Sequence, residues 1–332
     1  MKLHPDSQKI VDAIRDGGRP PMEAMSVEEA RASYAAAREA SMGPPVPVAA
    51  VEEITLAGPA GALAVRLYRP APRGCGPLPL LVYFHGGGWV LGGISSHDGL
   101  CRRLAAGSGA AIASVEYRLA PEHPFPAGLE DAVAAVRELA ARAASLEIDP
   151  ARIGVGGDSA GGTLAAVAAI EARDAGGPQL ACQLLLYPVT DLAMDTPSHV
   201  CFATGHSLTR GAMVWFRDQY LGSGDPLHWR VSPLRAERLD GLPPAYVLTA
   251  SHDPLRDEGE AYGQRLVASG VPTTLWRVPG MLHGFLPMDK AIAPAAPATD
   301  AVARALRHML DAGTHGAASA PAPVGAPSRE DA

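Results

Sequence analysis

The sequence "GVGGDSAGG" at residues 154–162 joins a short apolar run, "RIGVGG", to a helical stretch of small residues, "AGGTLAAVAAIEARDAG". It contains the pattern G-x-S-x-G, in which Ser159 stands between Gly157 and Gly161. A serine hydroxyl is a poor nucleophile unless it projects toward a base, and a tight turn from strand to helix with small neighbours produces that projection. Ser159 is therefore a candidate nucleophile, although the pentapeptide alone would equally suit an ordinary glycine-rich turn.

The same glycines could also begin a nucleotide-binding loop. Gly154 and Gly156 follow a predicted strand as in a dinucleotide fingerprint, but Ser159 occupies the position of the third glycine. No Gly-Lys-Ser or Gly-Lys-Thr follows any glycine cluster, which argues against a phosphate-binding P-loop. We therefore expect no organic cofactor.

Apolar runs alternate with helical stretches on both sides of this turn, which predicts buried parallel strands joined by helices. Upstream, "VEEITLAG" and "ALAVRLYRP" flank a Gly-Pro-Ala-Gly turn and predict an antiparallel hairpin. The later runs are "LPLLVYF", "AAIASVEY", "RIGVGG", "CQLLLYPV", "AYVLTAS" and "TTLWRVP". The expected fold class is α/β, with a mostly parallel eight-stranded sheet and helices on both faces, as in the α/β-hydrolase fold.

Two segments interrupt this alternation and are expected to form a helical cap. Residues 1–45 read as helical, with Ser26 and Glu29 spaced as a capping box. Residues 191–241 are too long for a simple connection and contain the helical stretch "TRGAMVWFRDQYL". The catalytic core then comprises residues 46–190 and 242–312, and residues 313–332, rich in Ala, Pro, Gly and Ser, are expected to be a disordered tail.

A second glycine cluster, "FHGGGWVLGG", directly follows the predicted strand "LPLLVYF". Acyl transfer builds negative charge on a carbonyl oxygen, and preorganised backbone N–H groups stabilise that charge. A loop of this HGGG type supplies one donor, and the residue after the nucleophile, here Ala160, supplies another. A flexible turn is the alternative interpretation. His85 is expected to brace this loop and not to catalyse.

Two further candidates follow later predicted strands. Asp253 comes after "AYVLTAS", and His283 comes after "TTLWRVP". The order serine, acid, histidine along the chain is the order of the α/β-hydrolase triad, in which the histidine is the base and the acid orients it. Three carboxylates rival Asp253 as the acid: Asp191, Asp257 and Glu258.

Composition excludes several classes of protein. With 47% hydrophobic and 19% charged residues the chain can bury a large core, and its net charge of −7 offers no basic surface for nucleic acid. No apolar run is long enough for a membrane span, and the amino terminus has no apolar segment of the signal-peptide kind. The cysteines, Cys75, Cys101, Cys182 and Cys201, show no metal-ligand spacing. We expect a cytoplasmic protein with reduced thiols and no metal.

Taken in order, the motifs "HGGGW", "YRLAPEHPFPA" (117–127), "GDSAGG", "DPLRDEG" and "HGF" resemble those of the hormone-sensitive-lipase-like bacterial esterases, often called family IV. The resemblance runs from the amino-terminal helices to about residue 312 and implies a capped serine carboxylesterase acting on small esters of short to medium acyl chains. Homodimers are common in this family, so a homodimer is one expectation. The family pattern assigns nucleophile, acid and base to Ser159, Asp253 and His283, and the oxyanion N–H donors to Gly87, Gly88 and Ala160.

Two other functions stay open at this point. A peptidase or amidase could use the same triad, and a small-molecule binding protein could use the same scaffold, as the plant gibberellin receptors do after losing the histidine. Retention of His283 argues against the binding protein. Six apolar residues are candidates for the substrate pocket or, equally, for ordinary core packing: Trp89, Phe202, Met213, Trp215, Phe216 and Leu286.

Overall fold

One mixed sheet forms the centre of the protein. The computed structural model describes residues 2–18, 20–71 and 76–316, and within these ranges eight strands pair in the order β1-β2-β4-β3-β5-β6-β7-β8. Strand β2 is antiparallel to β1 and β4, and the pairs from β4 to β8 are parallel. The predicted α/β-hydrolase sheet and its first hairpin are confirmed. The strands are β1 (Ala50–Gly58), β2 (Gly61–Arg69), β3 (Leu78–Phe84), β4 (Ala111–Val115), β5 (Ile148–Asp158), β6 (Cys182–Leu186), β7 (Ala245–His252) and β8 (Thr273–Leu282).

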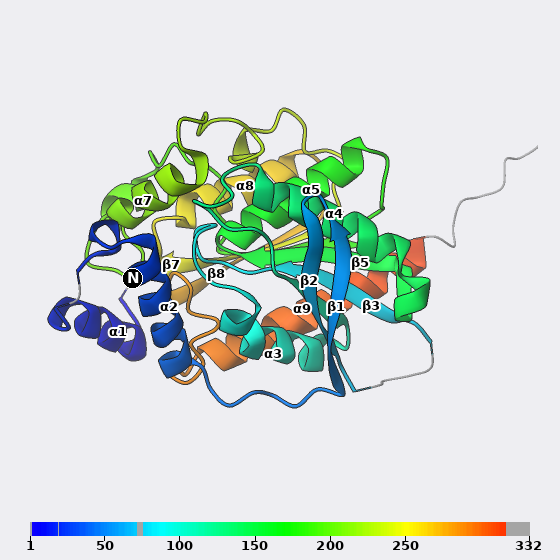
Figure 1. Cartoon of the computed structure of the whole chain (residues 1–332), viewed down its shortest axis with the longest axis horizontal. Coiled ribbons are helices and arrows are strands. Elements are labelled where there is room, and N and C mark those ends of the chain that lie inside the picture. The colour runs from blue at the N-terminus through cyan, green and yellow to red at the C-terminus, as the bar shows by residue number, and fades with distance from the viewer. Residues whose placement is uncertain (1, 19, 72–75, 317–332) are drawn as a thin grey trace, which may run out of the picture.

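Helices cover both faces of the sheet (Figure 1). One face carries α4 (Ala127–Ala141), α5 (Ala160–Asp174) and α8 (Arg256–Ala268), and the other carries α3 (Asp98–Ser108) and α9 (Ala295–Gly316). The remaining α-helices in the described ranges are α1 (Pro5–Asp16), α2 (Val27–Ser41), α6 (Pro197–Cys201) and α7 (Arg210–Leu221). Short 3₁₀ turns are η1 (Met22–Ala24), η2 (Ile94–His97), η3 (Ala144–Leu146) and η4 (Pro233–Arg235).

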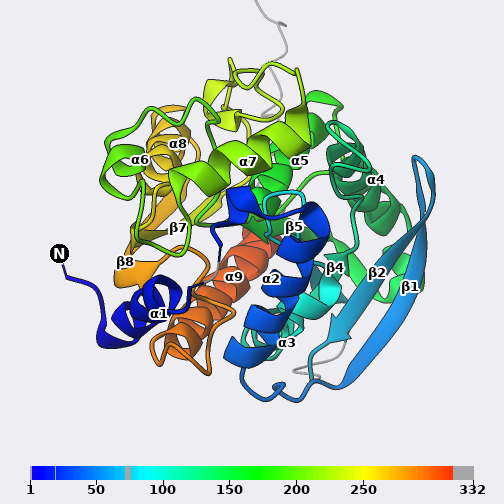
Figure 2. The same ribbon diagram turned by 60° about the vertical axis from the view of Figure 1, so that its left-hand side comes forward.

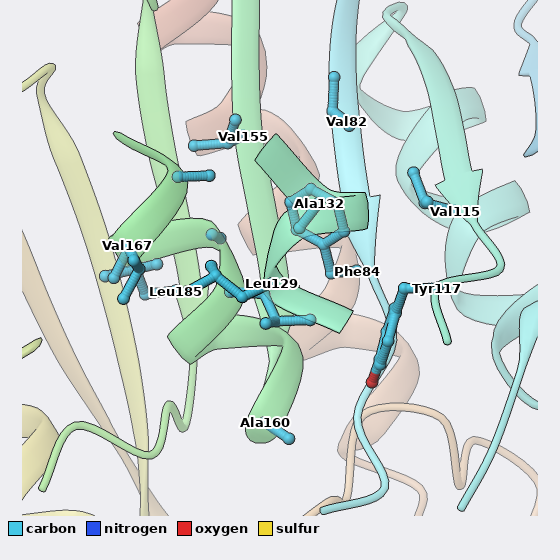
Figure 3. Packing of buried hydrophobic residues seen from close by; sticks show 14 of the residues in the cluster. Val82, Phe84, Val115, Tyr117, Leu129, Ala132, Val155, Ala160, Val167 and Leu185 are labelled. Atoms are coloured by element: carbon cyan, nitrogen blue, oxygen red, sulfur yellow. The ribbon is translucent and has the colours of Figure 1, made fainter. Parts of the chain in front are cut away.

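The parallel strands are buried on both sides, which explains their almost continuous apolar sequences. In β3, Val82 and Phe84 belong to the core beneath α4 and α5, whereas Leu81 and Tyr83 belong to the core beneath α3 and α9. Figure 3 shows Phe84 among the residues that pack against α4 and α5, and Leu129 is one of their partners. This packing fixes the strand ends, and with them the loops that carry the candidate site.

The two segments predicted to form a cap lie at one end of the sheet, where α1, α2 and α7 gather (Figures 1 and 2). The turn η1, between α1 and α2, contacts α7 in the inserted segment. Helix α2 begins with the predicted capping box: Glu29 N–H donates to Ser26 Oγ at 3.2 Å, and Ser26 N–H donates to Glu29 Oε2 at 2.8 Å. Arg31 then ties α2 to the "YRLAPEHPFPA" loop through Glu122, with two hydrogen bonds of 2.7 Å.

At the carboxyl end, α9 continues to Gly316, four residues past the boundary expected at residue 312. The rest of the expected tail, residues 317–332, lies outside the described residues, as does Cys75. Cys101, Cys182 and Cys201 are free thiols. In the described ranges no helix has the length and apolar character needed to cross a membrane, and no three or more His, Cys, Asp or Glu side chains gather as metal ligands.

Candidate active site

Ser159 lies at the turn from β5 to α5. Its φ of 54° and ψ of −120° are unusual for a residue with a side chain, and its N–H donates to the carbonyl of Leu186 at 2.9 Å. A Cβ atom at Gly161 would collide with the carbonyl oxygen of Phe84, and one at Gly157 would collide with the backbone of Gly161. The small neighbours therefore permit a strained turn that presents the serine side chain, as in a nucleophile elbow.

His283 and Asp253 meet Ser159 at the carboxyl edge of the sheet. Nε2 of His283 lies 2.9 Å from Oγ of Ser159, and Nδ1 lies 2.7 Å from Oδ2 of Asp253. Asp253 is fully buried, and its other oxygen accepts the N–H of Leu255 at 2.9 Å. The ring of Tyr187 packs edge-on against His283, with 5.1 Å between ring centroids. The hydrogen bonds hold the imidazole between an acid and a hydroxyl, the geometry of a nucleophile–base pair oriented by a third group.

The rival acids are engaged elsewhere. Asp257 accepts the N–H of Ser198 at 2.8 Å. Asp191 accepts a hydrogen bond from Nε of Arg235 at 2.9 Å. Glu258 is fully buried and lies 2.8 Å from Nε2 of His199, an arrangement that links α8 to α6. Burial raises the pKa of Glu258 despite this histidine. None of the three contacts His283, so Asp253 is the acid that the geometry favours.

The HGGG loop brings backbone donors to the same place. Gly87 and Gly88 have φ values of 126° and 61°, which favour glycine, and within the described chain neither N–H has a hydrogen-bond acceptor. Ala160 is the first residue of α5, where a helix leaves its N–H groups without intrahelical partners. A Cβ atom at Gly88 would collide with the ring of Phe216 in α7. These three N–H groups are available to an oxyanion near Ser159.

The buried ring of His85 supports the HGGG loop. This ring is fully buried, stacks on Tyr117 at 4.3 Å between centroids, and holds Nδ1 2.9 Å from the carbonyl oxygen of Gly86. Burial and the neighbouring His97 lower the pKa of His85 to about 4. The imidazole is therefore neutral near pH 7 and serves the loop rather than the reacting atoms.

Asp158 links the serine turn to the HGGG loop, a role that the sequence did not disclose. The carboxylate accepts hydrogen bonds from Gly86 N–H at 2.8 Å and Tyr83 Oη at 2.7 Å, and Nε2 of His97 lies 3.2 Å away. Burial alone would raise the pKa of Asp158, but the interaction with His97 and the hydrogen bonds outweigh burial and hold the pKa well below its usual value. One carboxylate thus fixes the nucleophile turn and the donor loop relative to each other.

Replacement of Asp158 by alanine should destabilise the protein by about 3–5 kcal/mol, because it leaves buried polar groups without their partner. Asp158→Asn, which keeps an acceptor for Gly86 and Tyr83, should cost less. Urea unfolding of the two variants checks this order. The carboxylate's contribution to stability should be present above the ordinary aspartate pKa and be lost only at lower pH, because the folded-state pKa is depressed. Equal stability of wild type and Asp158→Ala would contradict the assigned role.

A cavity of about 470 Å³ opens at Ser159 and His283 and lies beneath α2 and α7. Of the six apolar candidates from the sequence, Trp89, Met213 and Phe216 line it. Phe202, Trp215 and Leu286 are not among the lining residues, so for these three the alternative of ordinary packing holds. Leu286 is buried in the core on the α3–α9 side, and Trp215 packs against its neighbour in α7. Further lining residues come from the amino-terminal segment: Ile10, Met22, Met25, Tyr34 and Arg38.

Comparisons with known proteins agree with this geometry. Residues 81–287 match a family model described as an alpha/beta hydrolase fold. The carboxylic ester hydrolase LipN of Mycobacterium tuberculosis is 45% identical over 320 residues, which cover 93% of this chain and 83% of LipN. An ethyl acetate hydrolase of Pseudomonas putida is 37% identical over 93% of this chain and all of its own length.

Solved structures extend the similarity to the whole fold. An α/β hydrolase from the metagenome of Lake Arreo superposes with a TM-score of 0.89 at 42% identity, covering 95% of this chain and 99% of its own. A hyperthermophilic esterase from the archaeon Pyrobaculum calidifontis gives a TM-score of 0.87 at 40% identity, covering 93% of this chain and 99% of its own.

Proposed function

The chain belongs to the α/β hydrolase fold family, among the hormone-sensitive-lipase-like carboxylic ester hydrolases, and from this premise we propose that Ser159, His283 and Asp253 hydrolyse esters through an acyl-enzyme. The observation that carries the assignment is the chain of two short contacts, 2.9 Å from Ser159 to His283 and 2.7 Å from His283 to Asp253. It places a base within reach of the nucleophile and an acid behind the base.

In the first half of the reaction, His283 takes the proton of Ser159 as Oγ attacks the ester carbonyl. Negative charge then develops on the carbonyl oxygen, and the N–H groups of Gly87, Gly88 and Ala160 stabilise it. When the tetrahedral intermediate collapses, the bond to the alcohol oxygen breaks and His283 gives that oxygen its proton. The serine retains the acyl group.

In the second half, His283 removes a proton from water, and the water oxygen attacks the acyl-enzyme. The same N–H groups stabilise the second oxyanion, and His283 returns the proton to Oγ of Ser159 as the carboxylic acid leaves. Asp253 keeps Nδ1 of the imidazole oriented throughout. Each of these steps uses only groups of the protein and water.

We further propose that the enzyme prefers short to medium acyl chains. The cavity of about 470 Å³ lies in the lower part of the 300–1,000 Å³ range of small-molecule sites, and Met213 and Phe216 of α7 line it. Residues 1–45 and 191–241 would form the cap that encloses the ester. A series of p-nitrophenyl esters from acetyl to palmitoyl tests this preference: kcat/KM should be highest for the shorter chains, and a maximum at palmitoyl would contradict it.

The amidase alternative has no specific support, since the named relatives are ester hydrolases. Matched ester and amide substrates separate the two activities, and faster cleavage of the amide would favour the alternative. We also propose a cytoplasmic location, in keeping with the free thiols of Cys101, Cys182 and Cys201. The homodimer stays a prediction, and measurement of the molar mass in solution tests it.

A further inference from the structure

Arg38 is a buried cation in the wall of the cavity. It lies in the last turn of α2, only 7% of its surface is exposed, and it lines the same cavity as Ser159 and His283. Its guanidinium lies against Gly284, the residue that follows His283: Nη1 donates to the carbonyl oxygen of Gly284 at 3.3 Å. The charge therefore sits beside the base of the reaction, inside an otherwise mainly apolar cavity.

The guanidinium has few partners for a buried charge. Besides that single long hydrogen bond, the guanidinium interacts with the neutral hydroxyl of Tyr34, and Nε is buried without a hydrogen-bond partner in the described chain. No carboxylate of the described residues lies within ion-pair distance of Arg38. Arg31, in the same helix, and Arg118 show the usual arrangement, since they bind Glu122 and Asp131 respectively through paired hydrogen bonds.

The polar groups around Arg38 do not neutralise the charge of its guanidinium. The guanidinium of Arg38 lies over the ring of Tyr34, 4.9 Å from the centroid, and the Tyr34 hydroxyl that it interacts with carries no charge to balance it. Asp158 interacts with Arg38 at longer range, but its oxygens are already bound to other groups. Glu23, another carboxylate in the lining, lies beside Gly211 in the first turn of α7.

A buried, unpaired guanidinium is costly, and the cost is offset when an anion with matching geometry binds it. Arginine remains protonated at all ordinary pH values, so it cannot escape the cost by losing its proton. Its planar fork binds carboxylates in particular, because two N–H groups can meet two oxygens. A ligand that enters this cavity next to His283 can supply that anion.

We propose that Arg38 is a specificity-determining residue that binds a carboxylate carried by the substrate, so that the preferred substrates are esters with a second, anionic group. This inference rests on the proposed function, because the anion is part of the ester that Ser159 attacks. The carboxylate belongs either to the acyl chain or to the alcohol, and both positions can be tested.

Two pairs of substrates test the proposal, with hydrolysis followed by pH-stat titration. The first compares monoethyl glutarate with its neutral counterpart, in which an isopropyl group replaces the free carboxylate. The second compares the acetate ester of gamma-hydroxybutyrate with the same isopropyl replacement. In wild type, kcat/KM should favour the anionic member of at least one pair, and the pair that shows the preference identifies the side of the ester that carries the charge.

The variant Arg38→Gln should lower that anionic-to-neutral ratio by about 10- to 100-fold, the value of a hydrogen-bonded charge pair. Arg38→Lys should retain part of the preference, because it keeps the charge but loses the fork. Arg15→Gln removes an exposed charge from α1 and serves as the matched control, whose ratio should equal that of wild type. Thermal unfolding of each variant verifies folding, and if Arg38→Gln does not fold, Arg38→Lys and the wild-type ratio decide.

Each result has a separate meaning. Wild type that hydrolyses neutral esters but prefers neither anionic ester overturns this inference and leaves the esterase function intact. An Arg38→Gln variant that loses activity on both members equally, with an unchanged ratio, shows a structural role only and also overturns it. Absence of hydrolysis of every ester would instead refute the proposed function.

Discussion

Replacement of Ser159 by alanine should lower kcat for ester hydrolysis on the order of 10⁶-fold, the loss expected when the nucleophile of such a triad is removed. The hydroxyl lies 2.9 Å from Nε2 of His283, and alanine leaves no atom that can form the acyl-enzyme. The oxyanion donors and the cavity stay in place, so substrate should still bind. Hydrolysis of p-nitrophenyl acetate and butyrate by purified wild type and variant at neutral pH checks the prediction.

A remote serine provides the control. Ser145 lies in η3, is exposed and donates to the carbonyl of Arg142 at 2.8 Å, so Ser145→Ala should keep wild-type activity. A fluorophosphonate reagent should add its mass to wild type and to Ser145→Ala but not to Ser159→Ala. Substantial esterase activity in Ser159→Ala, with labelling of another residue, would show that a different nucleophile operates.

The candidate site could be predicted from the sequence because sheet topology determines where loops meet. Ser159, Asp253 and His283 each follow a strand, and the carboxyl ends of parallel strands share one edge of the sheet. Asp253 and His283, which lie 94 and 124 positions after Ser159, therefore reach the serine although no short motif connects the three residues. The sheet itself could be predicted because parallel strands are buried on both faces and therefore have almost continuous apolar sequences.

Contacts between side chains on different elements carried no such signal. His97 and Asp158 are 61 positions apart, and they meet because the fold brings the end of η2 to the end of β5. A lone histidine in a sequence does not reveal its partner, so no pattern in the sequence predicts this contact. The cap presents the same difficulty: helical periodicity in α7 identifies an apolar side but not whether Met213 or Trp215 faces the cavity. Arg38 likewise gave no sign of its burial.

Replacement of Asp253 by asparagine should lower kcat by about 10⁴-fold while the fold is retained. The carboxylate accepts Nδ1–H of His283 at 2.7 Å, which leaves Nε2 free to receive the serine proton. An asparagine side chain can present its NH₂ group to Nδ1 instead, and the ring then carries its proton on Nε2, where it cannot act as a base. Steady-state kinetics on a short-chain p-nitrophenyl ester, with circular dichroism to verify folding, measure the loss.

Asp257→Asn is the matched control, because it removes a neighbouring carboxylate that is bound to Ser198 and Arg256 and not to the histidine. It should leave kcat within a few-fold of wild type. An equally large loss of kcat in both variants would mean that this segment tolerates no change of charge, and it would contradict the special role of Asp253.

The Asp253→Asn variant also tests the mechanism. If the imidazole of His283 carries its proton on Nε2, acylation and deacylation are both slowed, because His283 acts as base in both steps. Asp253→Asn should therefore not accumulate acyl-enzyme beyond the wild-type level. Accumulation of acyl-enzyme in that variant would indicate that Asp253 serves chiefly the water-activating step.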